Sequence, residues 1–242
     1  MRPPERPSRP DVLTLLSEGE IAVKGRLPWS SNGTFLVEVC EQEEPLRAVY
    51  KPLRGERPLW DYPPGLYRRE VAAYAVSEWL GWGIVPETVE RDGPLGPGSL
   101  QRFVDADFAE HYFTLLERPE HHDALKRICT FDLLVNNGDR KSGHCLLGDD
   151  DGFIWAIDHG LCFHPHPKLR TVIWDFEGQP IPEGCMEDIR RLALSAGESV
   201  AGLAGVLSPD EIEALVERAA AMARRPYFPA ARSARAFPWP LV

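Results

Sequence analysis

The sequence has no long apolar run and no excess of positive charge, and each absence excludes a class of protein. No segment approaches the roughly 18 apolar residues that a membrane span requires, and the N-terminal residues lack the apolar core of a signal peptide. We therefore expect a cytoplasmic protein with no transmembrane segment. The 37 acidic residues outnumber the 27 basic ones. This balance argues against nucleic acid as a partner, because sequence-independent binding needs clustered cations.

Cysteine is also scarce, and its pattern excludes a disulfide framework. The five cysteines are an odd number at scattered spacings: Cys40, Cys129, Cys145, Cys162 and Cys185. We interpret them as reduced thiols of the core. With 43% apolar residues, the 242-residue chain can bury one substantial core or two small lobes.

Apolar periodicity divides the chain into a strand-rich first half and a helical second half. Alternation predicts strands at 21–23, 35–40, 46–50, 84–89 and 99–104, and helical spacing predicts helices at 11–20, 66–80, 106–116, 122–135, 187–196 and 209–225. The proline-rich ends predict a disordered tail at 1–10 and an extended tail at 226–242. We therefore expect an α+β fold, with a β-rich N-lobe at 11–104 and a mainly helical C-lobe at 105–225.

The most informative stretch is a polar loop followed by a predicted hairpin. Two apolar strands, 145–147 and 153–157, flank a turn-forming run at 148–152, which predicts an antiparallel hairpin. The residues before the first strand and after the second lie at the same end of a hairpin. Asp139 and His144 should therefore lie close to Asp158. Phosphoryl transfer needs two such carboxylates, one to orient a hydroxyl and one to hold a divalent cation.

Two features of the first half fit a nucleotide site. Residues 30–34 predict a tight turn whose backbone donors could cover a phosphate, and an ordinary β-turn is the alternative. Lys51 ends a predicted strand, and Glu70 lies near the start of a predicted helix. Glu70 could complement the helix dipole, or it could hold Lys51 against the phosphates of a nucleotide.

Taken together, these segments resemble the phosphatidylinositol 3- and 4-kinases, closest to the type II 4-kinases, and the uncharacterised actinobacterial proteins that carry this kinase-like core. The resemblance spans about residues 20 to 180 and is carried by successive motifs: Val49-Tyr-Lys-Pro52, Leu66-Tyr-Arg-Arg-Glu-Val-Ala-Ala-Tyr74, Ile84-Val-Pro-Glu-Thr88, Gly98-Ser-Leu-Gln-Arg-Phe-Val104, Asn137-Gly-Asp-Arg140 and Ala156-Ile-Asp-His-Gly-Leu161. It implies a two-lobed, protein-kinase-like fold with ATP between the lobes.

The resemblance also implies a role for each site residue. Asp139 would be the catalytic aspartate, Asp158 the metal aspartate, and Arg140 or Lys141 would offset charge on the transferred phosphate. Nucleotide contacts would come from the loop, the lysine and its partner, and the hinge: Ser31, Asn32, Gly33, Thr34, Lys51, Glu70, Gln101, Phe103 and Val104. The cofactors would be ATP with Mg²⁺ or Mn²⁺.

The chain departs from the family at His144, where the family has an asparagine. Magnesium prefers oxygen ligands to imidazole. The histidine could bind manganese or one metal of two, it could orient a phosphate without a metal, or the site could have lost turnover. A nucleotide-binding pseudokinase is therefore the alternative to an active enzyme.

Two further alternatives concern metal and acceptor. Cys162, His164 and His166, with His144 and Cys145, invite a zinc site, although their spacing matches no structural finger. The hydroxyl acceptor could be a phosphoinositide, a protein or a small polyol. For a lipid acceptor, peripheral membrane contact could come from segment 164–174, through Lys168, Arg170, Ile173 and Trp174.

Overall fold

A computed structural model describes residues 9–28, 30, 32–40, 45–149, 152–195, 202–231 and 233–242. Contacts divide the chain into two compact units. Unit 1 comprises residues 1–71 and 86–103, and unit 2 comprises residues 72–85 and 104–242. The chain thus passes three times between the units, and α2 (Leu66–Trp79) contributes residues to both.

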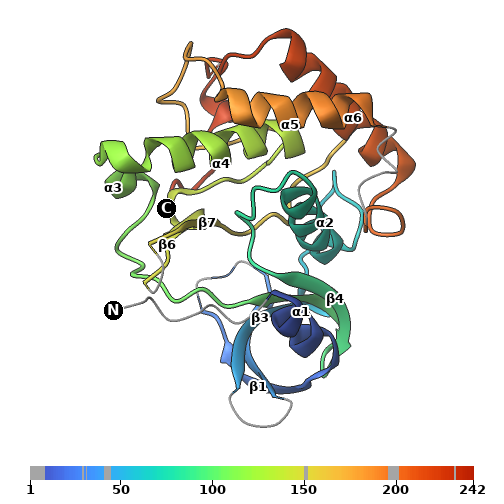
Figure 1. Cartoon of the computed structure of the whole chain (residues 1–242). Helices are drawn as coiled ribbons and strands as arrows, with labels where there is room; N and C mark the ends of the chain where they lie inside the picture. The colour runs from blue at the N-terminus through green and yellow to red at the C-terminus, as the bar shows by residue number, and fades with distance from the viewer. Residues whose placement is uncertain are drawn as a thin grey trace. The chain divides into compact units, whose positions relative to one another are not determined.

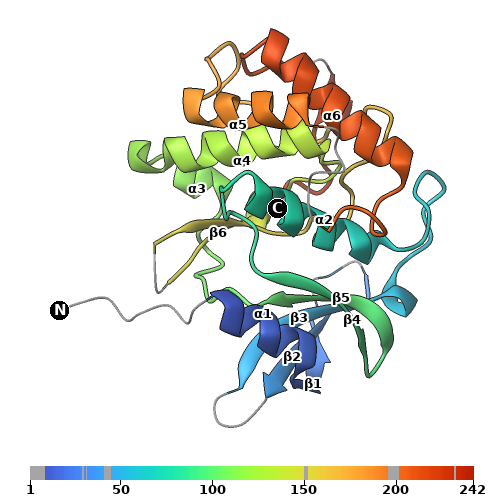
Figure 2. The ribbon, with the colours of Figure 1, turned by 45° about the vertical axis from the view of Figure 1, so that its right-hand side comes forward.

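Unit 1 is a five-stranded antiparallel sheet with one helix packed on it (Figure 1). The strands are β1 (Glu20–Arg26), β2 (Phe35–Cys40), β3 (Leu46–Pro52), β4 (Thr88–Gly93) and β5 (Gly96–Arg102), in the order β1-β2-β3-β5-β4. Figure 2 shows α1 (Arg9–Glu18) lying along the sheet. Leu16 of this helix is buried with Val37, Tyr50 and Leu100. The hydrophobic face of the sheet is therefore covered by α1, and a short 3₁₀ helix (Leu53–Gly55) follows β3.

The register of the sheet decides which side chains share a face. Arg26 pairs with Phe35, and Phe35 pairs with Tyr50. Directly opposed residues on neighbouring strands point to the same face, and successive residues alternate. Arg26, Phe35 and Tyr50 therefore share the face covered by α1, while Lys51 points to the other face.

Unit 2 is built from helices and a short hairpin. Its helices are α3 (Tyr112–Leu116), α4 (His122–Val135), α5 (Glu183–Leu194) and α6 (Pro209–Arg224), with 3₁₀ turns at Pro119–His121, Ser142–His144 and Ala234–Ala236. The hairpin consists of β6 (Cys145–Leu147) and β7 (Ile154–Ala156). In Figures 1 and 2, α4, α5 and α6 lie side by side. Ser208 caps α6 through a bond from the Glu211 amide. The helices and the hairpin share one apolar core that includes Phe131, Ile154 and Ile189.

The expected α+β class is confirmed, but some expected elements have other bounds. The strand expected at 84–89 is β4 at 88–93, because the amides of Ile84 and Val85 bond to the Ser77 hydroxyl instead of a strand. The helix expected at 106–116 is confined to 112–116, since the Asp107 carboxylate accepts the Ala109 amide and forms a local turn.

The cysteines have no disulfide partners among the described residues, and four of the five are buried. Burial raises the pKa of Cys145 to about 12, so this thiol is protonated at neutral pH. Cys40 is exposed, and the expectation of a core position is wrong for this residue. Within the described segments, every helix is too short or too polar to cross a bilayer.

Candidate active site

The polar loop begins where α4 ends in a left-handed residue. The helix ends at Val135, as its apolar spacing predicted, and the C-cap is Asn136, with φ of 54°. Asparagine is among the few residues other than glycine that tolerate this conformation. The side-chain Nδ2 of Asn136 donates to the backbone carbonyls of His164 and His166, and its Oδ1 accepts from the backbone amide of Lys168. The end of α4 thus holds residues 164–168, which we call the histidine-rich loop.

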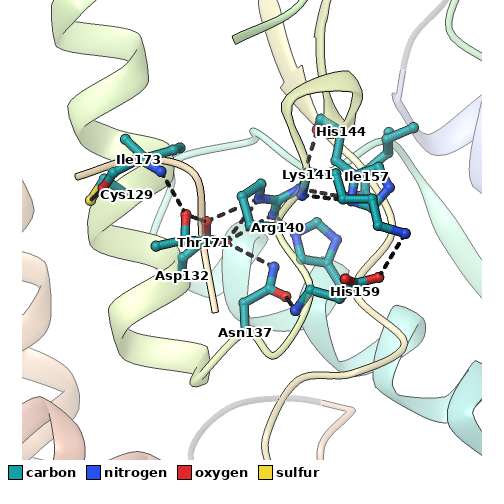
Figure 3. Close-up of polar contacts among 11 residues, drawn as sticks. Cys129, Asp132, Asn137, Arg140, Lys141, His144, Ile157, His159, Thr171 and Ile173 are labelled. Atoms are coloured by element: carbon teal, nitrogen blue, oxygen red, sulfur yellow. Dashed lines mark hydrogen bonds and ion pairs between the residues drawn. The ribbon is translucent and has the colours of Figure 1, made fainter. Parts of the chain in front are cut away.

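Arg140, one residue after the predicted catalytic aspartate, is fully buried. Figure 3 shows its guanidinium between α4 and the loop. It donates to both carboxylate oxygens of Asp132 at 2.9–3.1 Å and to the carbonyls of His144 and Ile157. One of its nitrogens also lies 2.8 Å from His159 Nε2. This network joins α4, the polar loop and the residue after Asp158.

These contacts correct the role expected for Arg140. Its side chain and that of Asp132 are both 0% exposed, and its nitrogens are engaged by protein groups. A phosphate at the surface would not reach the guanidinium, so Arg140 positions the loop. Sequence reasoning missed Asp132 and Thr171, whose hydroxyl lies 3.4 Å from the same carboxylate. The signal available in the sequence was an acidic residue, Asp132, within the apolar run at 128–135.

Asp139 and Lys141, on either side of Arg140, are partly exposed and form an ion pair. Lys141 Nζ lies 3.2 Å from Asp139 Oδ2. The Asp139 amide donates to the Asn137 side chain, which fixes the start of the loop. Burial raises the pKa of Asp139, Lys141 opposes that shift, and nearby Asp158 adds to it. A carboxylate with a raised pKa is suited to accept a proton from a hydroxyl.

The hairpin brings Asp158 and His144 together as the sequence predicted. His144 Nε2 lies 3.3 Å from Asp158 Oδ2. The influence of Asp158 on Asp139 places the second carboxylate within electrostatic range of the first. Asp158 has φ of 61°, a conformation that L-residues rarely adopt and that recurs at functional sites. Its side chain is 46% exposed, so a ligand has access to its oxygens.

The donor set fits a divalent cation bound through one or two carboxylates. Magnesium in nucleotide sites uses few protein oxygens and takes its remaining ligands from phosphates and water. Asp158 offers such oxygens, and the His144 Nε2 lies 3.3 Å from one of them. Among the described residues, no group of three or more His, Cys, Asp or Glu side chains is arranged to hold a metal ion. The zinc alternative around Cys162, which is itself buried, therefore has no site there.

Unit 1 contains the predicted lysine and its acidic partner in contact. Lys51 Nζ donates to Glu70 Oε1. The Lys51 side chain is 22% exposed, whereas that of Glu70 is 2% exposed. The carboxylate therefore fixes the ammonium of a side chain that is partly exposed.

The predicted phosphate-covering loop bonds to the segment that follows β3 and to itself. The Gly33 amide donates to the Gly55 carbonyl at 2.7 Å, and the Asn32 side chain accepts the Arg57 amide. The Thr34 hydroxyl pairs with Ser30 at 2.7 Å and is buried. Ser31 lies outside the described residues. Extending the β2–β3 register by one position puts Thr34 opposite Lys51.

The predicted hinge residues are occupied in different ways. The Gln101 side chain is buried in β5 and donates to Thr88, so it packs the sheet. The Phe103 amide donates to the Arg47 carbonyl. Val104 belongs to unit 2, where it is buried with Leu146.

The C-terminal residues contact the polar loop, a feature that sequence reasoning missed. The Ser142 amide donates to the Leu241 carbonyl at 2.8 Å, and the Thr171 amide donates to the Ala236 carbonyl at 3.0 Å. Trp174 packs against Phe237 with ring centroids 6.3 Å apart. Segment 164–174 therefore does not present its apolar residues as expected for membrane contact, and Ile173 is only 1% exposed.

Comparisons with known proteins agree with this geometry. The family described as phosphatidylinositol 3- and 4-kinase matches residues 65–189, which include Asp139 and Asp158. Protein Rv2133c of Mycobacterium tuberculosis (strain ATCC 25618 / H37Rv) is 40% identical over 267 aligned positions that cover 96% of this chain and 96% of the relative. The chain belongs to the phosphatidylinositol 3- and 4-kinase family. The family resemblance is confirmed, and the mycobacterial relative supports an actinobacterial branch.

Solved structures show the fold at low sequence identity. The hydra Fam20 structure with sugar matches with a TM-score of 0.60 at 13% identity and covers 88% of this chain and 86% of that chain. The Golgi casein kinase with Mn/ADP bound matches with a TM-score of 0.56 at 13% identity and covers 89% and 74%. The protein-kinase-like fold expected for this family member is therefore confirmed.

Proposed function

We propose that this family member is an ATP-dependent phosphotransferase that moves the γ-phosphate of ATP to a hydroxyl group. The observation that carries the proposal is the junction of the polar loop and the hairpin. There Asp139, with its raised pKa, lies within electrostatic range of exposed Asp158. Family membership supports the reaction class, because the matched residues include both aspartates.

Asp139 accepts or orients the acceptor hydroxyl, and Lys141 offsets charge on the transferred phosphate. Lys141 is suited to this role because it is partly exposed and lies 3.2 Å from Asp139. Lys51, held by Glu70, neutralises phosphates of ATP. Thr34, opposite Lys51 in the extended β2–β3 register, could contribute to phosphate binding on the same face of the sheet as this lysine. Preorganised charges of this kind supply most of the catalysis in phosphoryl transfer.

The cofactor is ATP with Mg²⁺ or Mn²⁺. Asp158 would hold the cation, which would neutralise phosphate oxygens. His144, 3.3 Å from Asp158, would favour manganese over magnesium because imidazole is a better ligand for manganese. The Golgi casein kinase with Mn/ADP bound, which shares this fold, is consistent with that choice.

The test is phosphate transfer by the pure protein from labelled ATP. Phosphoinositide vesicles, a protein extract and inositol are supplied in parallel, each with magnesium or manganese. We expect label in one acceptor class. Asp158→Ala should abolish transfer and leave the fold intact, although alanine at a φ of 61° should lower the Tm slightly. Transfer by Asp158→Ala at the wild-type rate would rule out the role of Asp158.

A second candidate function is a nucleotide-binding pseudokinase. The contact between His144 and Asp158 favours it, since a protonated imidazole would compete with the cation for the carboxylate. ATP binding without loss of the γ-phosphate under all conditions would decide for this function. Restored transfer in His144→Asn would show that the histidine is the cause.

A further inference from the structure

Unit 1 contains a second basic site that the proposed phosphotransfer does not use. A pocket of about 270 Å³ lies where the ends of β1 and β3 meet the β4–β5 turn. Three arginines, Arg26, Arg54 and Arg57, line it around apolar walls of Phe35, Pro52 and Leu95. We refer to it as the arginine pocket.

The arginine pocket lies on the opposite side of the sheet from Lys51. Arg26 and Phe35 are paired, and Phe35 is paired with Tyr50, so these side chains share one face. Lys51, next to Tyr50, points to the other face, where Glu70 holds it. The pocket is therefore separate from the predicted nucleotide lysine.

Two segments that line the pocket are in close contact with each other. The Gly33 amide donates to the Gly55 carbonyl, and the Arg57 amide donates to the Asn32 side chain. A Cβ added to Gly55 would lie 2.5 Å from the Gly33 oxygen, and one added to Gly33 would lie 2.9 Å from the Gly55 Cα. Backbone alone fits at this point. The segments that carry Arg54 and Arg57 are therefore held in place, even though the arginine side chains are exposed.

The charges of the pocket are not balanced within the described part of the chain. Arg26, Arg54 and Arg57 form no ion pair with any residue that the structure describes, and the lining contains no carboxylate among those residues. The chain as a whole has a formal net charge of −10, so this concentration of cations is local. Mutual repulsion among them is relieved when an anion binds.

We propose that the arginine pocket binds a phosphate monoester. A phosphate offers several charged oxygens to guanidinium groups, which match its geometry better than a single carboxylate does. The pocket is smaller than typical drug-sized sites, which suits a phosphate on a group as small as a sugar or glycerol. Such a phosphate could be soluble or could belong to a lipid headgroup. Leu59 and Trp60, three residues or fewer beyond Arg57, are exposed at 39% and 93% and would favour a bilayer source.

The first arm of the test uses glucose 6-phosphate, with glucose as the uncharged control, in calorimetric titrations at low salt. We expect binding of the phosphate only. Arg54→Gln and Arg57→Gln should each weaken it roughly tenfold or more, since each removes a charge-assisted hydrogen bond. Arg235→Gln changes net charge equally at an exposed position of unit 2 and should bind as the wild type does. All three positions are exposed, so thermal unfolding should be unchanged.

The second arm uses sedimentation with phosphatidylcholine vesicles, with or without phosphatidic acid. Arginine-dependent binding to phosphatidic acid vesicles would identify a lipid source, and binding to glucose 6-phosphate alone a soluble one. Failure of both probes to bind overturns the proposal. So does undiminished binding by the Arg54→Gln/Arg57→Gln double variant.

Lys51→Gln separates the arginine pocket from the nucleotide site. We expect this variant to bind the probes with wild-type affinity. Loss of binding in Lys51→Gln would place the anion at Lys51 and overturn the proposal. The titrations contain no nucleotide, so their result is independent of whether the protein transfers phosphate.

Discussion

Two ion pairs, one in each unit, differ in what they leave exposed. Arg140 and Asp132 of unit 2 are both 0% exposed, and the arginine also bonds two carbonyls. Lys51 of unit 1 is 22% exposed, although its partner Glu70 is buried. The family resemblance implied that both Arg140 and Lys51 offset charge on phosphates. Their surroundings separate them, because a buried cation with every donor satisfied holds structure, whereas a partly exposed one is accessible to a ligand.

The largest expected effect is on the buried pair. Arg140→Met leaves the Asp132 carboxylate buried without its partner, which typically costs about 3–5 kcal/mol of unfolding free energy. Denaturant titration would measure the loss. Arg118→Met is the matched control, because its pair with Glu110 is about one-third exposed, and it should cost about 0–1 kcal/mol. Equal losses in the two variants would show that Arg140 does not anchor the loop.

The pair of Lys51 and Glu70 should affect turnover more than stability. In the proposed mechanism Lys51→Gln removes a charge from the phosphates, and we expect phosphate transfer to fall by roughly 10²–10³-fold, a few kcal/mol of barrier. Glu70 can take up a proton once the Lys51 ammonium is removed, which limits the loss of stability. Initial rates and denaturant titration on the same preparation would compare the two. A stability loss as large as that of Arg140→Met, with transfer intact, would reverse the assignment.

The pH dependence of phosphate transfer would compare Asp139 and Lys141 within the polar loop. The pKa of Asp139 is raised by burial, and Lys141 holds it down. In the proposed mechanism transfer requires the deprotonated Asp139 carboxylate, so activity should rise with pH through that pKa. Lys141→Met removes the lowering effect and should move the acid limb of kcat/KM to higher pH. An acid limb that stays in place would show that a group other than Asp139 controls it.

The smallest effect should come from the C-terminal contact. A variant ending at Pro240 loses the bond from the Ser142 amide to the Leu241 carbonyl, worth about 1 kcal/mol. We expect kcat to fall a few-fold with KM for ATP unchanged, because the loop and not the nucleotide lysine is loosened. A variant that lacks only Val242 retains that carbonyl and is the control. An effect confined to KM would contradict a role in holding the loop.

Local sequence patterns predicted the parts of the site that depend on neighbours in the chain. The turn at 148–152 was sufficient to predict the hairpin that joins His144 to Asp158, and the alternation around Val49 predicted β3. Ile84 and Val85 resembled strand residues because they are apolar, yet they pack in the core of unit 2. That choice depends on Ser77, which binds their amides, and no periodicity reveals it.

The roles of individual polar residues were harder to predict, because they depend on partners far along the chain. Arg140 looked like a phosphate ligand until Asp132 and Ile157 were seen to enclose it. The same holds for Gly33, whose amide was expected over a phosphate and instead meets Gly55. Sequence spacing can predict which groups lie at one end of a hairpin. It cannot predict which of their hydrogen-bond donors and acceptors are engaged by other protein groups.

Asn136 shows how few substitutions a position with two duties can accept. Glycine would adopt its φ of 54° with ease but would release His164, His166 and Lys168. Aspartate would keep the acceptor and forfeit both donors. A substitution at this position could therefore be accommodated only if the sequence of the histidine-rich loop changed with it. A chimera between relatives should for this reason exchange the helix end and the loop together.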